Sequence, residues 1–131
     1  MKTLLVAIAA LTALWAPASA SSKSTLEGRW KNGAMEILIA PCGKALCGTV
    51  VKASPKQEAK AERGSGTDLV GARLITGIEP TGRGTYRGRV FVADHNVHAN
   101  GTIRQVSRDQ LKVRGCVLGF VCRSKTWDRV R

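Results

Sequence analysis

Residues 26–53, LEGRWKNGAMEILIAPCGKALCGTVVKA, contain three short apolar runs separated by two turn signals. The first run ends at Asn32-Gly33, which is the strongest two-residue signal for a β-hairpin. In the second, Met35, Ile37 and Ile39 alternate with Glu36 and Leu38 until Pro41, and the third occupies residues 46–53. Such alternation is typical of strands that bury one face. The segment therefore predicts three antiparallel strands that fold back on one another.

The same pattern continues through the rest of the chain. Further runs recur about every ten residues and are separated by turn signals; they occupy residues 69–78, 85–93, 97–106, 110–117 and 122–130. Helical crossovers between successive strands are missing from the pattern, which argues against a parallel α/β sheet. A meander of about eight strands hides its edges best by closing on itself. We therefore predict an all-β fold, a small antiparallel up-and-down barrel.

Residues 55–66 break the strand pattern. They contain no β-branched residue, and charged side chains of both signs alternate with alanines. This composition favours a helix but provides no apolar face beyond alanine. We expect a short helix or a loop insertion, and in either form it can cover the mouth of a barrel.

The N-terminus has the features of a cleaved signal peptide. Lys2 precedes an apolar run over residues 4–15, and Ala18-Ser19-Ala20 is a small-residue cleavage signature. A membrane-spanning helix needs about 20 apolar residues, and Pro17 interrupts this run earlier. The sequence of 131 residues therefore predicts a signal peptide over residues 1–20, one domain over residues 21–131, and export to the periplasm or the medium.

Export determines how the four cysteines are interpreted. In an oxidising compartment an even number of cysteines indicates disulfides, and four cysteines allow three pairings. Cys42 and Cys47 bracket one predicted turn, and Cys116 and Cys122 bracket another, so we favour these two local pairs. A zinc site and a redox centre are the alternatives. The spacings match neither a zinc knuckle nor a Cys-x-x-C motif.

One alternating set of side chains is expected to face the barrel interior. Its members are Ile37, Ile39, Val50, Leu74, Ile78, Tyr86, Val90, Leu111 and Val113. A register error of one residue would exchange members of this set for their neighbours. A small eight-stranded barrel either fills with side chains or holds one small ligand. These residues are therefore the candidate contacts for a small apolar or amphipathic ligand.

The basic residues are concentrated in the second half of the chain. Lys and Arg number 21 against 9 acidic residues, and from Arg83 onward eleven basic residues accompany three acidic ones. Arg87 and Arg89 share a predicted strand face, as do Lys112 and Arg114. They predict a cationic outer face that attracts anionic lipid headgroups or lipopolysaccharide.

Several other activities find no support in the sequence. The aromatic residues of the predicted domain are too few and too scattered for a nucleic-acid stacking platform. Asp94, His95 and His98 surround one turn but lack a further ligand cluster, so we interpret them as exposed polar residues and predict no metal site. Nucleophile-elbow and phosphate-loop motifs are missing from the sequence. We therefore expect a monomer without cofactor, without nucleic-acid partner and without enzymatic activity.

Three segments carry a family resemblance: LEGRW at residues 26–30, IAPCGKALCG at residues 39–48, and LKVRGCVLGFVCRSKTW at residues 111–127. Together they resemble a bacterial family of secreted proteins known as domain-of-unknown-function family 2147. The resemblance extends from Leu26 to the end of the chain. It implies a lipocalin-like antiparallel barrel and brings no established reaction.

Gly28-x-Trp30 is also similar to the Gly-x-Trp on the first strand of lipocalins. This resemblance implies that Trp30 plugs the closed end of the barrel. A cation from a late strand can lie across the face of such an indole. Arg123 and Arg129 are the two candidates.

Two hypotheses about function follow. The first is an exported barrel that binds a small apolar or amphipathic ligand in its interior. The second is an envelope-associated protein whose basic face binds anionic lipid or lipopolysaccharide. Salt distinguishes them, because salt screens exposed charges and leaves apolar burial nearly unchanged.

The predicted processing has a direct test. Cleavage after Ala20 makes Ser21 the first residue of the exported protein, because the small residues before it suit the signal peptidase. Mass spectrometry of protein recovered from the periplasm or medium should give the mass of residues 21–131. Retention of the complete chain inside the cell would contradict this prediction.

Overall fold

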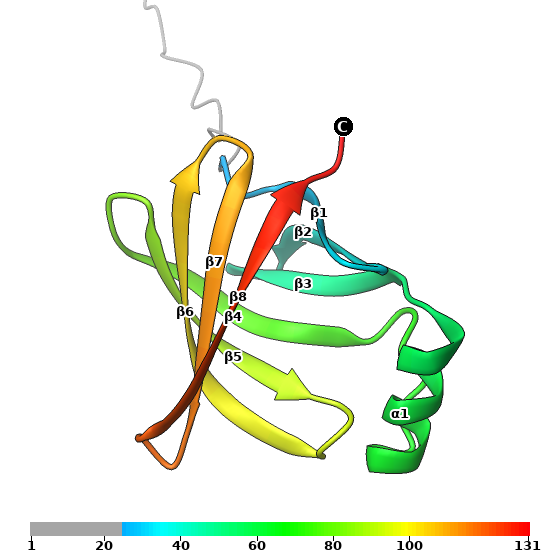
Figure 1. The fold of residues 1–131 in the computed structure, drawn as a ribbon. Coiled ribbons are helices and arrows are strands. Elements are labelled where there is room, and N and C mark those ends of the chain that lie inside the picture. Colours follow the sequence, from blue (N-terminus) through cyan, green and yellow to red (C-terminus); the bar gives the residue numbers. More distant parts are fainter. Residues whose placement is uncertain (1–24) are drawn as a thin grey trace, which may run out of the picture.

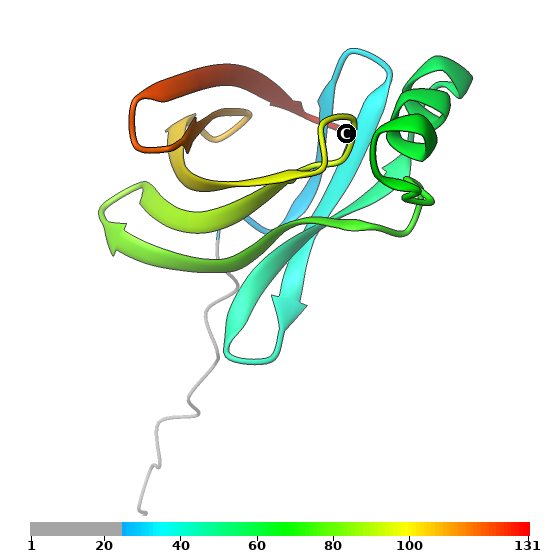
Figure 2. The same cartoon turned by 90° about the horizontal axis from the view of Figure 1, so that it is seen from below.

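The structure, a computed structural model, describes residues 25–131, so the predicted signal peptide lies outside the described part. Eight strands form a closed antiparallel barrel in which each pairs with its neighbours in chain order (Figures 1 and 2). The strands are β1 (Gly28–Asn32), β2 (Met35–Cys42), β3 (Ala45–Lys52), β4 (Arg73–Gly82), β5 (Thr85–Val92), β6 (Val97–Ser107), β7 (Gln110–Val117) and β8 (Val121–Arg129). The predicted up-and-down barrel is confirmed.

Tight turns join the strands of each hairpin. Gly33, Gly43 and Gly84 all have positive φ angles at these turns, a conformation that glycine adopts without steric cost. Both local disulfides are present. Cys42–Cys47 joins β2 to β3, and Cys116–Cys122 joins β7 to β8. Each bridge therefore links the two strands of one hairpin, as predicted.

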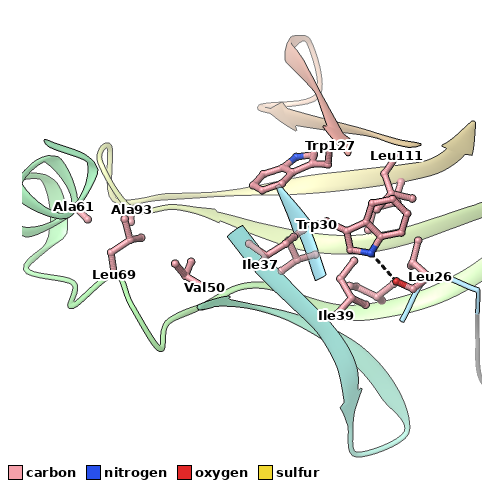
Figure 3. Close-up of a cluster of buried hydrophobic side chains, with 13 residues drawn as sticks. Leu26, Trp30, Ile37, Ile39, Val50, Ala61, Leu69, Ala93, Leu111 and Trp127 are labelled. Carbon is pink, nitrogen blue, oxygen red and sulfur yellow. Dashed lines mark hydrogen bonds between the residues drawn. The ribbon is translucent and has the colours of Figure 1, made fainter. Parts of the chain in front are cut away.

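The barrel interior is apolar. Trp30 is fully buried, and its indole Nε1 donates a hydrogen bond to the carbonyl of Leu26, 2.9 Å away (Figure 3). Side chains from several strands complete the same core; among them are Ile37, Ile39, Val50, Ile75, Ile78, Ile103, Leu111 and Trp127. Because the indole N–H has a partner, burying this large side chain leaves no polar atom unsatisfied.

The alternation on β4 differs from the prediction. Leu74 was expected inside together with Ile78, but Ile75 and Ile78 are the buried residues, and Leu74 is half-buried. The register shifts between Thr76 and Glu79, and Gly77 between them has a φ of 61°. An extra residue at such a bulge reverses which side chains face inward. Strict alternation therefore misses Ile75, the more deeply buried neighbour, while Leu74 packs against the edge of the core.

Residues 55–66 form a helix for most of their length, α1 (Pro55–Ser65). The Ser54 side chain accepts a hydrogen bond from the Gln57 backbone, and Gln57 reciprocates, which is a capping box. The helix is anchored to the β5–β6 turn because Ser65 Oγ donates to the carbonyl of Ala93 at 2.7 Å. In the part of the chain that the structure describes, no helix has the length and apolar character needed to cross a bilayer.

Trp30 should dominate the stability of the barrel. Trp30→Ala removes the largest fully buried side chain and should lower the free energy of unfolding by about 3–5 kcal/mol. Urea denaturation followed by circular dichroism measures this loss. Val106→Ala, at an exposed position, is the control and should change stability by less than about 0.5 kcal/mol. Equal effects of the two substitutions would contradict the role of Trp30.

Candidate functional site

Most of the predicted interior residues lie in the core. Five are no more than 2% exposed: Ile37, Ile39, Val50, Ile78 and Leu111. Tyr86, Val90 and Val113 are partly buried and pack against the same cluster. A contact of these side chains with a ligand stays a prediction.

Glycines from neighbouring strands show how tightly this interior is packed. A Cβ atom added at Gly101 would lie 2.7 Å from Val90 Cγ2, and one at Gly88 would lie 3.2 Å from Ile75 Cγ2. Both distances are shorter than ordinary van der Waals contact between carbons. At these two positions the neighbouring strands therefore leave little space for a side chain.

Two open hollows lie on the outside of the barrel. One of about 690 Å³ is lined by Thr25, Glu27, Gly84, Gln105, Ser107, Arg108 and Arg129. The other, of about 440 Å³, is lined by Lys60, Arg63, Gly64, Asp94 and His95. Neither contains a residue of the predicted interior set. The hollows therefore provide no enclosed apolar pocket of the kind that small ligands require.

Arg129, the second of the two candidate cations, lies over the indole of Trp30. Its Cζ atom is 4.2 Å from the ring centroid. The guanidinium also donates hydrogen bonds to the carbonyls of Thr25, Glu27 and Arg108 at 2.7–3.1 Å. Arg123 is exposed and lies near the start of β8, at the other end of the strand from Arg129. These contacts place Arg129 against Trp30 and against the segment before β1, and the role of Trp30 as a plug of the barrel end stays a prediction.

Asp94, His95 and His98 do not converge on one point. His95 Nε2 lies 3.6 Å from the Asp94 carboxylate, whereas the His98 ring packs against Phe91 with centroids 4.8 Å apart. Among residues 25–131, no group of three or more His, Cys, Asp or Glu side chains could hold a metal ion. The turn presents polar residues without a binding geometry.

Basic side chains lie together on the outer face of β5, β6 and β7. The strand register aligns Arg87 with Thr102 and Thr102 with Arg114. Two residues farther along β6, Arg104 lies directly opposite Lys112 of β7. These four basic residues, and Arg89 on β5, are all exposed. We refer to Arg87, Arg89, Arg104, Lys112 and Arg114 as the basic face.

Acidic residues neutralise little of this surface. Arg87 forms an ion pair with Glu79 at 3.0 Å. The other four members of the basic face form no ion pair with a carboxylate of residues 25–131. Arg104 was absent from the predicted face, because its position opposite Lys112 depends on the register between β6 and β7. The result is a patch of unpaired positive charge on one side of the barrel.

The comparisons with known proteins agree with this fold. No curated protein matches the chain. One solved structure, the Helicobacter pylori protein HP1028, is described as belonging to the lipocalin family. The two are 11% identical, with a TM-score of 0.60, and the match covers 81% of this chain and 83% of that one. At this identity the likeness shows a shared fold.

A lipocalin-like barrel is a fold that can hold a small ligand. The two disulfides and a bacterial family are consistent with an exported protein. The family profile described as "Uncharacterized protein conserved in bacteria (DUF2147)" matches residues 28–129. This match includes all eight strands of the barrel, and the chain therefore belongs to that family.

Proposed function

We propose that this protein binds anionic, phosphate-bearing surfaces of the bacterial envelope through its basic face. The carrying observation is the direct opposition of Arg104 and Lys112 across β6 and β7. Like charges in such a cross-strand pair destabilise a sheet. An anionic partner would relieve that repulsion. The pair would therefore destabilise the free protein and favour the bound one.

The neighbouring residues extend the same positive field. Arg89 and Arg114 lie on the same outer surface and lack a carboxylate partner among residues 25–131. A basic residue near an anionic membrane contributes about 1 kcal/mol of binding free energy. Several such residues on one face give an attraction that depends on salt.

The packed interior is the reason for placing the contact outside the barrel. A small-molecule site needs a cavity of about 300 Å³ or more. Here the approach of the Gly101 backbone to Val90 leaves no room for one added carbon atom. The two open hollows contain none of the predicted interior residues. This supports a contact on the outside of the barrel.

Vesicle binding tests the proposal. The protein should bind vesicles of phosphatidylglycerol and phosphatidylcholine more tightly than vesicles of phosphatidylcholine alone, and rising salt should weaken that binding. Arg104→Gln/Lys112→Gln should reduce affinity about thirtyfold, from about 1 kcal/mol per removed charge. A parallel titration with lipopolysaccharide micelles distinguishes a glycerophospholipid from a lipopolysaccharide surface.

The control removes the same number of charges elsewhere. Lys44→Gln/Lys52→Gln alters two exposed lysines at the ends of the β2–β3 hairpin and should reduce affinity by less than about threefold. Equal losses in the two variants would indicate a general effect of net charge. No binding of the unaltered protein to any anionic surface would refute the proposal.

The repulsion itself can be measured as stability. Lys112→Glu converts the pair with Arg104 into an attractive one and should stabilise the fold by about 0.5 kcal/mol. The melting temperature should rise by about 2–4 °C while vesicle binding falls. Lys44→Glu, in a turn, is the control and should leave the melting temperature nearly unchanged. A lower melting temperature for Lys112→Glu would show that the two charges do not oppose folding.

A further inference from the structure

The turn between β7 and β8 exposes an unusual amount of apolar surface. Leu118 is 80% exposed, Phe120 is 77% exposed and Val121 is 51% exposed. The turn lies at the end of the hairpin, across the barrel from α1 (Figure 1). We define the apolar tip as residues 117–121. Single exposed apolar residues are common on proteins, but here three follow closely in one turn.

The backbone of the apolar tip is held in a fixed shape. Cys116 and Cys122 are directly opposite each other in the register and form a disulfide. Leu118 has a φ of 57°, a conformation that is unfavourable for a branched side chain and that Gly, Asn or Asp normally occupies. A leucine at this position therefore lowers the stability of the folded state.

Basic residues surround the apolar tip. Residues 110–127 include Lys112, Arg114, Arg123 and Lys125 and contain no acidic residue. Along a strand, Arg123 lies about 7 Å from Val121, at about 3.3 Å per residue. Apolar side chains of interfacial proteins enter about 5–10 Å below the lipid headgroups. With the tip at that depth, Arg123 and Arg114 would lie at the level of the phosphates.

From this arrangement we infer that the apolar tip inserts into the interfacial layer of an anionic phospholipid membrane. This inference rests on the proposed function and gives that function an orientation. Leu118 and Phe120 contact the acyl chains, and Arg114 and Arg123 contact the phosphates. The disulfide keeps the turn formed before binding, so little conformational entropy is lost on insertion.

The first experiment compares exposed apolar residues at different places. Leu118→Ser/Phe120→Ser should reduce affinity for vesicles of phosphatidylglycerol and phosphatidylcholine about thirtyfold, from about 1 kcal/mol per apolar side chain removed from water. The matched control, Val70→Ser/Val106→Ser, also replaces two exposed apolar residues. It should change affinity by less than about threefold. Equal affinities of the two variants would overturn the inference.

The second experiment locates the tip in the membrane. Phe120→Trp should show a blue shift of fluorescence on vesicle addition and quenching by brominated lipid. Trp30 and Trp127 are 0% and 7% exposed, so their emission should change little. Val106→Trp is the control and should keep the emission of an indole in water. An unshifted, unquenched indole at position 120 would also overturn the inference.

The outcomes separate the inference from the function on which it rests. If Arg104→Gln/Lys112→Gln weakens vesicle binding but the tip variant binds like the unaltered protein, the basic face acts without insertion and only the inference fails. If the unaltered protein does not bind anionic vesicles, both fail. Loss of binding in the tip variant, with insertion of the indole at position 120, supports both.

Discussion

The contact between the Arg129 guanidinium and the Trp30 indole is the interaction on which closure of the barrel depends. The register between β1 and β8 contains two residue pairs, Trp30 with Arg129 and Lys31 with Asp128. So short a ladder provides few backbone hydrogen bonds. Arg129 compensates by stacking on Trp30 and by bonding to carbonyls of the segment before β1 and of the β6–β7 turn. One side chain thus joins three segments where the sheet is weakest.

This closure fixes one end of β8 and leaves the other end to the β7–β8 hairpin. In the described registers, residues 121–128 of β8 pair with β7, and only Asp128 and Arg129 pair with β1. The hairpin can therefore extend past the barrel wall without disturbing the core around Trp30. The Cys116–Cys122 disulfide stabilises this part, where cross-strand support comes from one side. One end of β8 therefore closes the barrel against β1, and the other end carries the exposed β7–β8 turn.

The fold was largely predictable because its signals are local. Asn32-Gly33, the alternation of apolar residues and the cysteines around two turns depend on near neighbours in the chain. The errors occurred where the signal is not local. Gly77 gives no sign in the sequence that it introduces a bulge, so the alternation includes Leu74, which is half-buried against the core, and omits the more deeply buried Ile75. Arg104 was missed because its opposition to Lys112 is a property of strand register. The sequence predicts the turn between Cys116 and Cys122, but the exposure of its apolar side chains depends on where the hairpin ends relative to the barrel.

Size gives a physical reason for proposing the site on the surface of the barrel. A small barrel has one core to stabilise it, and each void in that core costs stability. Glycines at positions 88 and 101 let the strands approach closely enough to fill it. Side chains on the outer face do not contribute to that packing, so the sequence is free to place like charges opposite each other there. A tightly packed core and a charged outer face are therefore complementary consequences of building one barrel from so short a chain.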